Sequence, residues 1–324
     1  MDEDRIQIAV AGVGGAGSNA VNRLTRLGAP KQARLMAFNT DKKHLVTLDK
    51  SIDRMLIGSA VTKGLGTGGF PSVGEKAAHA SRKIIKESVR ECDLLFLCAG
   101  MGGGTGTGAA PIIAGHAKDA GALVVAMVTY PFQIEKARLA KARKGIAKLA
   151  DICDTVVVID NNRLYKYVPN LPMEKAFEVA DSVVARAANG IAKTVLEPSL
   201  INLDFADLSS AMADRGLGMI AVGEGAGYSR VQDTAETLRK NTLLDANMED
   251  ASGVLLHFTG GPDLTIGEAN EAGELATSDM PDDANVLFGA RIEEAHEKKL
   301  EAFAIFTGIP SPLLLDETPG KEQD

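Results

Sequence analysis

Residues 102–108 read GGGTGTG and constrain the fold of this chain more than any other stretch. They follow a short apolar run at 94–99 and lead into AAPIIAGHA, an order typical of a strand, a glycine loop and a helix. Glycine lets the backbone approach an anion because no Cβ stands in the way. The free N–H groups and the positive end of the following helix then attract negative charge. The stretch therefore predicts a phosphate-binding loop rather than a flexible linker.

Two further glycine loops lie upstream. Residues 12–17, GVGGAG, follow an apolar strand at 6–11 and open a helix that Ser18 or Asn19 is placed to cap. Residues 58–74 form the third loop, GSAVTKGLGTGGFPSVG. Three loops at one edge of a sheet suit a nucleoside triphosphate, because each phosphate needs its own donors. The chain has no G-x-x-x-x-G-K-[ST] motif, which excludes a P-loop protein.

The loop at 12–17 also leaves an oxidoreductase open as an alternative. It matches G-x-G-x-x-G, and Asp41 lies downstream at a distance suited to a ribose hydroxyl, which is the fingerprint of NAD-binding dehydrogenases. A dehydrogenase does not need two more glycine loops, however, and none of the five histidines lies in a recognisable catalytic motif. These two observations favour a triphosphate over a dinucleotide.

Short apolar runs alternate with helical segments through the first half of the chain, which predicts a parallel sheet with helices on both faces. After a long helix bounded by Pro172 and Pro198, strands and helices are less regularly interleaved, which predicts an α+β arrangement. The main expected strands are 35–38, 94–99, 123–128, 155–159, 219–222, 254–258, 286–290 and 302–307, with later helices at 209–215 and 230–241.

The predicted fold class is therefore α/β. We expect a doubly wound, mostly parallel, Rossmann-like domain at 1–171, a long central helix at 172–200 and a smaller α+β domain at 201–312. Residues 313–324 are expected to form a short disordered tail. A length of 324 residues is sufficient for two domains that each bury a core.

Composition narrows the class of partner. The net charge of −8 and the aromatic content of 4% argue against a nucleic-acid surface and against an anionic membrane surface. Three cysteines without a C-x-x-C pair are typical of buried thiols in a reducing compartment. The start, MDEDRIQIAV, does not read as a signal peptide, and no apolar run is long enough to insert in a membrane. We therefore expect a cytoplasmic protein that any membrane partner must tether.

Two stretches carry a family resemblance. AGMGGGTGTGAAP, around 102–108, resembles the signature loop of the tubulin/FtsZ superfamily, and NLDFADL at 202–208 resembles the synergy loop of FtsZ, of archaeal or bacterial type. The resemblance implies that the first domain is a GTPase domain using GTP/GDP and Mg²⁺, and that the protein forms head-to-tail filaments for the cell-division ring at mid-cell. A tubulin-like filament for cell shape or DNA segregation is the alternative. The resemblance also implies that division proteins or a membrane adaptor are partners. The short sequence after Pro310 departs from the long tail that is usual in the family.

The resemblance implies a GTP site built from the three loops and the start of the long helix. The residues assigned to the α- and β-phosphates are Gly14, Gly15, Ala16, Gly17, Ser18 and Asn19. Those assigned to the β- and γ-phosphates, with Mg²⁺ held mainly by phosphates and water, are Thr67, Gly68, Gly102, Gly103, Gly104, Thr105, Gly106 and Thr107. Asn39 is placed near the phosphates through water. Glu135 and Arg138 are assigned to the ribose region, although the family usually has one more residue between them.

The same resemblance assigns Asn161 and Asp181 to the edge of guanine and Phe177 to its face. Chemistry supports Asp181 independently, because one carboxylate can accept from both N1–H and the N2 amino group of guanine. Without the resemblance, Asp181 would read as a solvated helix charge and Phe177 as a core residue.

The remaining implied residues lie beyond the other end of the long helix. A helix over 172–197 would be roughly 40 Å long, since each residue rises about 1.5 Å. Asp204 and Asp207 therefore cannot reach the nucleotide of their own chain. The resemblance implies that they orient and polarise the attacking water at the site of the next subunit, with Asn202 supporting the loop. A helix cap at Asp207 is the structural alternative and does not exclude this role.

Overall fold

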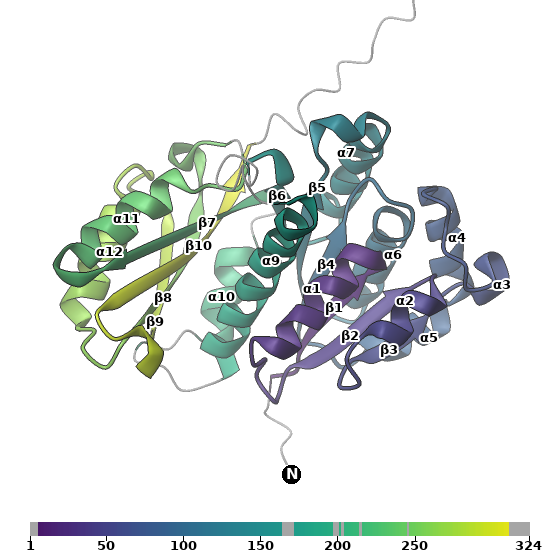
Figure 1. Ribbon diagram of the computed structural model, residues 1–324, viewed down its shortest axis with the longest axis horizontal. Coiled ribbons are helices and arrows are strands. Elements are labelled where there is room, and N and C mark those ends of the chain that lie inside the picture. Colours follow the sequence, from purple (N-terminus) through teal and green to yellow (C-terminus); the bar gives the residue numbers. More distant parts are fainter. Residues whose placement is uncertain are drawn as a thin grey trace, which may run out of the picture.

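A computed structural model describes residues 6–163, 172–196, 201, 204–213, 216–244 and 246–310 (Figure 1). Within these residues the strands form one continuous sheet in the order β3-β2-β1-β4-β5-β6-β7-β10-β8-β9. The first half supplies six of them, all paired in parallel. They are β1 (Ile8–Val13), β2 (Arg34–Asn39), β3 (Asp53–Leu56), β4 (Leu94–Gly100), β5 (Leu123–Tyr130) and β6 (Thr155–Asp160).

The second half continues the same sheet. Its strands are β7 (Gly216–Ala226), β8 (Gly253–Gly260), β9 (Asn285–Ile292) and β10 (Lys299–Ile309). Strand β7 lies parallel to β6, whereas β10 runs antiparallel to both β7 and β8. The first half is thus doubly wound and the second is mixed, which confirms the predicted fold class.

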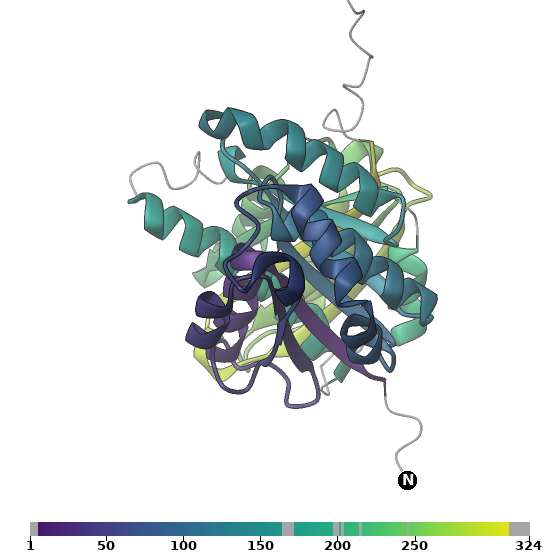
Figure 2. The same cartoon turned by 90° about the vertical axis from the view of Figure 1, so that its right-hand side faces the viewer.

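Helices cover both faces of the sheet, as the continuous apolar strands predicted. On one face lie α1 (Gly14–Arg26), α2 (Lys42–Thr47), α9 (Met173–Leu196) and α10 (Phe205–Met212). On the other lie α5 (Arg82–Val89), α6 (Thr105–Asp119), α7 (Lys136–Ala150), α11 (Arg230–Lys240) and α12 (Ile266–Thr277), with α4 (Pro71–Ala80) packed on α6. The short helix α3 (Ser59–Thr62) precedes α4. Figure 2 shows these two layers from the side of the first half.

The structure differs from the sequence-based expectations at three helices. Helix α1 begins at Gly14 without a side-chain cap, so Ser18 and Asn19 lie inside it rather than at its start. Helix α10 begins at Phe205 and not at 209, because the Asp204 side chain accepts a hydrogen bond from the backbone N–H of Asp207 at 2.7 Å. The cap is therefore Asp204 rather than Asp207. Helix α12 was not predicted, because glycines and acidic residues interrupt its apolar period.

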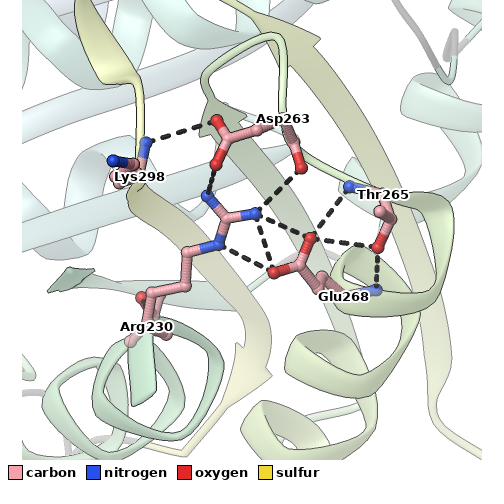
Figure 3. Close-up of polar contacts among 6 residues, drawn as sticks. Arg230, Asp263, Thr265, Glu268 and Lys298 are labelled. Atoms are coloured by element: carbon pink, nitrogen blue, oxygen red, sulfur yellow. Dashed lines mark hydrogen bonds and ion pairs between the residues drawn. The ribbon is translucent and has the colours of Figure 1, made fainter. Parts of the chain in front are cut away.

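A buried arginine holds the second half together (Figure 3). The Arg230 side chain is 6% exposed, and it pairs with Asp263 at 2.6 Å and with Glu268 at 2.7 Å. Glu268 also forms a capping box with Thr265 at the start of α12. The backbone N–H of Lys298 donates to the second oxygen of Asp263. One guanidinium thus joins α11 to α12 and to the loop after β8, and Asp263 of that loop is bonded to the turn before β10.

Candidate functional site

A pocket of about 530 Å³ lies at the carboxyl ends of the parallel strands β1, β2, β4 and β5. Ligands of open α/β sheets commonly bind at this edge. The three glycine loops converge on it, as their positions after successive strands predicted. The residues from the predicted set that line it are Gly15, Ala16, Asn39, Thr67, Gly68, Gly103, Gly104, Thr105, Gly106, Glu135, Arg138, Asn161 and Asp181.

The other predicted residues of the loops do not line this pocket. Most of them instead stabilise the conformation of the loops. A Cβ on Gly17 would lie 2.1 Å from the carbonyl oxygen of Cys98, so the backbone packs closely there. The Thr107 hydroxyl accepts a hydrogen bond from the N–H of Gly102 at 2.9 Å. Gly14 has φ of 73° and packs on Gly106, while Ser18 is buried. Asn19 is exposed on α1. Phe177 lies in the first turns of α9, but its side chain is outside the described part of the structure, as is all of Asn202.

Adjacent glycines in GGGTGTG serve different purposes. A Cβ on Gly104 would lie 2.0 Å from the Thr67 hydroxyl and 2.9 Å from the N–H of Phe70. The protein therefore requires glycine at 104 for packing. A Cβ on Gly103 would meet nothing within 4 Å and would point into free space at the pocket. Packing gives no reason for glycine at 103, whereas a ligand that approaches the backbone does.

These two glycines give a matched pair of variants. Gly104→Ala is expected to destabilise the fold by about 1–3 kcal/mol, because the new methyl group displaces the loop at 67–70. Gly103→Ala is expected to leave the free energy of unfolding within about 0.5 kcal/mol of wild type and still weaken nucleotide binding. Urea unfolding and a nucleotide titration on both variants test this. Unchanged nucleotide affinity in Gly103→Ala would contradict the role given to this loop.

Two polar groups in the pocket point to a ligand with its own donors and acceptors. Asn161 follows β6 directly and is 5% exposed, yet its Oδ1 has no hydrogen-bond partner among the described residues. Burial raises the pKa of Asp181 to about 7, with Arg23 opposing the rise and Glu178 adding to it. Glu135 and Arg138 instead pair with each other at 2.6 Å. Among the polar atoms that line this pocket in the described part of the chain, Oδ1 of Asn161 is therefore the one that is buried without a hydrogen-bond partner.

Sequence reasoning missed several residues of the wall. They are Val13, Thr40, Asp41, His44, Gly66, Gly69, Gly100, Met101, Thr129 and Pro131, with Asp41 considered only for a dinucleotide. Thr40 and Thr105 share a hydrogen bond of 2.7 Å between their hydroxyls, which joins the end of β2 to the start of α6. The polar run NTD at 39–41, which begins at the last residue of β2, is the signal that could have found Thr40.

Asp204 and Asp207 lie far from the pocket, as predicted. Asp181 lies near the start of α9, and Leu196 ends it about 22 Å further along at 1.5 Å per residue. Helix α10 precedes β7, which runs parallel to β6, so α10 lies at the amino ends of these strands. The glycine loops lie at the opposite, carboxyl edge. Both carboxylates are exposed.

The parallel sheet, the loops at its carboxyl edge and the long helix together define a tubulin-like GTPase. Residues 7–169 match the family model described as "Tubulin/FtsZ family, GTPase domain", and residues 216–310 match "FtsZ family, C-terminal domain". The chain belongs to the FtsZ family, and it is a GTPase that binds GTP and GDP. The two family matches favour a GTPase over the oxidoreductase alternative.

Archaeal proteins are among the similar ones. "Cell division protein FtsZ 2" of Methanocaldococcus jannaschii is 49% identical over 311 residues, covering 94% of this chain and 81% of the relative. The protein of the same name in Halobacterium salinarum is 45% identical over 318 residues, which cover 98% of this chain and 80% of the relative. An empty FtsZ dimer of M. jannaschii is among the solved structures that match, with a TM-score of 0.90 at 39% identity, covering 95% of this chain and 89% of that one. Within the described residues, no helix has both the length and the apolar character to cross a membrane.

Proposed function

We propose that the pocket holds GTP and that a second copy of the chain completes the catalytic site with Asp204 and Asp207. The observation that carries this is the separation described above: a pocket at the carboxyl edge of the sheet and two exposed carboxylates at the amino edge. Only a head-to-tail contact between copies brings the two together. Such a contact does not close on itself, so it generates filaments.

The phosphates are proposed to lie against the starts of α1 and α6. Both helices begin in glycine loops without a side-chain cap, so their first N–H groups are free for an anion. Gly15 and Gly103 have no neighbour within 4 Å of a Cβ position, which leaves room for close approach. Thr67 and Thr105 add hydroxyls, and Asn39 an amide.

The base is proposed to lie against Asn161 and Asp181, with Phe177 on the same helix as Asp181. The orphaned Oδ1 of Asn161 is a ready acceptor for a donor on the ligand. An ionised Asp181 would accept from two guanine donors that adenine does not present in this arrangement. Glu135 and Arg138 are proposed to bind the ribose region, where their mutual ion pair opens or shifts when the nucleotide enters.

Asp181 makes GTP affinity depend on pH. Because its pKa is about 7 in the free protein, and guanine requires the ionised form, affinity should rise as the pH rises through 7 and then level off. Binding at pH 6 is expected to be about tenfold weaker than at pH 8. Calorimetric titration of GTP across this range is the measurement.

Asp181→Asn is the control, because the terminal phosphate of GTP titrates in the same range. The variant should bind GTP about a hundredfold more weakly, since its amide turns a donor toward a guanine donor. The pH dependence that remains in the variant then belongs to the nucleotide. Equal pH profiles in wild type and variant would remove Asp181 from base recognition, and tight NAD binding without GTP binding would overturn the site as a whole.

Mg²⁺ is proposed to enter with the nucleotide. It favours oxygen ligands, keeps several waters and often binds through substrate phosphates. Among the described residues no cluster of three or more His, Cys, Asp or Glu could hold a metal ion. The hydroxyl and amide groups of the pocket fit a cation brought in on phosphates, and its charge would stabilise the leaving diphosphate.

Asp207 is proposed to polarise the attacking water, and Asp204 mainly to fix the turn that presents it. One oxygen of Asp204 is occupied by the N–H of Asp207. The Asp207 carboxylate is exposed, and no group within the described residues bonds to it, which supports a role toward a neighbouring subunit. Asn202 is proposed to support this turn. Orientation and charge stabilisation are the main requirements of phosphoryl transfer.

The filament is proposed to act in cell division, since the relatives above are named as cell division proteins. We propose a cytoplasmic protein that assembles at a mid-cell ring with division proteins or a membrane adaptor. A role in cell shape or DNA segregation is the alternative. Depletion of the protein separates them: cells that fail to septate while keeping their shape and DNA partition support division.

A further inference from the structure

His44 lies in the wall of the nucleotide pocket, although no motif in the sequence singles it out. Asp41 caps α2, because its Oδ1 accepts from the backbone N–H groups of Lys43 at 2.8 Å and His44 at 3.2 Å. Side chains of a helix point toward its N-terminus. The imidazole of His44 therefore lies back toward Asn39, the last residue of β2.

Three hydrogen bonds form a chain from Asp41 to Asn19, and two of them are made by this imidazole. The backbone N–H of Asp41 donates to Oδ1 of Asn39 at 3.2 Å. The amide nitrogen of Asn39 lies 3.2 Å from Nδ1 of His44. Nε2 of His44 lies 3.0 Å from Oδ1 of Asn19, which joins α2 to α1.

The backbone N–H of Asp41, at one end of this chain of hydrogen bonds, fixes which atom donates in each bond. A backbone N–H can only donate, so the oxygen of Asn39 faces Asp41 and its NH₂ group faces His44. Nδ1 of His44 must then accept, and the proton of the neutral imidazole lies on Nε2. That proton is donated to Oδ1 of Asn19, which leaves the NH₂ group of Asn19 to donate to another oxygen.

We propose that His44 is a positioning residue of the nucleotide pocket: as the Nε2–H tautomer it passes the amide orientation of Asn39 on to Asn19, so that Asn19 offers N–H donors to an oxygen of the nucleotide. Asn19 is not in the pocket wall itself, but it is exposed on α1 one turn after Gly15 and Ala16, which line the wall, and a helical side chain points back toward the preceding turn. Asn39 is 3% exposed, so without the imidazole its NH₂ group loses a partner that water cannot readily replace. This inference rests on the proposed nucleotide site.

The tautomer is tested directly by NMR on nucleotide-free protein labelled with ¹⁵N-histidine. The His44 signals are assigned by their loss in His44→Ala. We expect one proton on Nε2 and none on Nδ1, visible as distinct ¹⁵N shifts for the two ring nitrogens. A proton on Nδ1 at neutral pH would overturn the inference.

The second test compares GTP affinity in three variants. His44→Ala should bind GTP roughly fivefold more weakly, the effect of one lost net hydrogen bond. His44→Gln places an amide NH₂ near the position of Nε2 and should restore affinity to within about twofold of wild type, since the bond to Asn19 is kept. His44→Asn places an oxygen near the position of Nδ1 and keeps only the bond to Asn39. Its GTP affinity should therefore resemble that of His44→Ala. His79→Ala, an exposed histidine on α4, is the control and should bind as wild type.

The outcomes separate this inference from the proposed function. If wild type binds GTP and His44→Ala binds equally well, the positioning role fails and the GTP site stands. If wild type does not bind GTP, the proposed function fails, whereas the tautomer measurement still decides the orientation of the two asparagines.

Discussion

Asp207→Ala is expected to lower GTP turnover by about two orders of magnitude or more, the usual contribution of a group that activates water. GTP binding should be unchanged, because the pocket lies at the other edge of the sheet. Filaments should still form in GTP. In wild type, turnover per molecule should rise from near zero as the protein concentration increases, since a lone subunit has half a site.

A mixing experiment shows whether the two halves act between subunits. Asp181→Ala should bind GTP poorly but keeps Asp207, whereas Asp207→Ala keeps the pocket. Each should be nearly inactive alone, and the mixture should recover part of the wild-type turnover. Asp119→Ala, which removes an exposed carboxylate from the end of α6, is the control and should stay active. Turnover that does not depend on concentration, together with no recovery on mixing, would show that each chain holds a complete site.

Arg230→Met is expected to destabilise the protein by about 3–5 kcal/mol, the usual effect of removing one partner of a buried ion pair. The change leaves Asp263 and Glu268 facing each other without the guanidinium that joins them. Urea unfolding followed by circular dichroism is suitable, because the chain has no Trp. Arg239→Met removes a half-exposed partner of Asp279 and should cost less than about 1 kcal/mol. Equal losses in the two variants would contradict the role given to Arg230.

Because of the same ion pair, we expect the free energy of unfolding to depend on pH in the acidic range. The hydrogen bonds from Arg230 lower the pKa of Glu268 from its ordinary value of 4.5 to about 2. Since the folded state holds the carboxylate ionised, this stabilisation is present above pH 4.5 and is lost as the pH falls toward 2. Arg230→Met should lack this part of the pH dependence, which unfolding measured at a series of acidic pH values will show.

Periodic and glycine-rich features of the sequence predicted most of the fold. Continuous apolar runs predicted the buried parallel strands, and glycine loops after strands predicted where the pocket lies. Helix α12 escaped prediction because Gly267 and Gly273 interrupt it, and only the Thr265–Glu268 capping box marks its start. The start of α10 was missed because its cap depends on one side-chain bond within NLDFADL.

The sequence predicted which loops form the candidate site, but not which side chains contact one another across those loops. Thr40 and His44 were missed because their partners, Thr105 and Asn19, are 65 and 25 residues away in the chain. Pairings of this kind depend on how strands are ordered in the sheet, which local patterns do not state. Individual roles of the predicted nucleotide and catalytic residues stay predictions until the variants above are measured.

The placement of the pocket and of α10 at opposite edges of the sheet has a consequence for the ends of a filament. An open filament has one complete catalytic site fewer than it has subunits, because one terminal pocket always faces solvent. That terminal subunit keeps its GTP until another copy arrives. The two ends of every filament would therefore differ chemically, and average turnover per chain would report filament length, lowest for a dimer and approaching a plateau in long filaments.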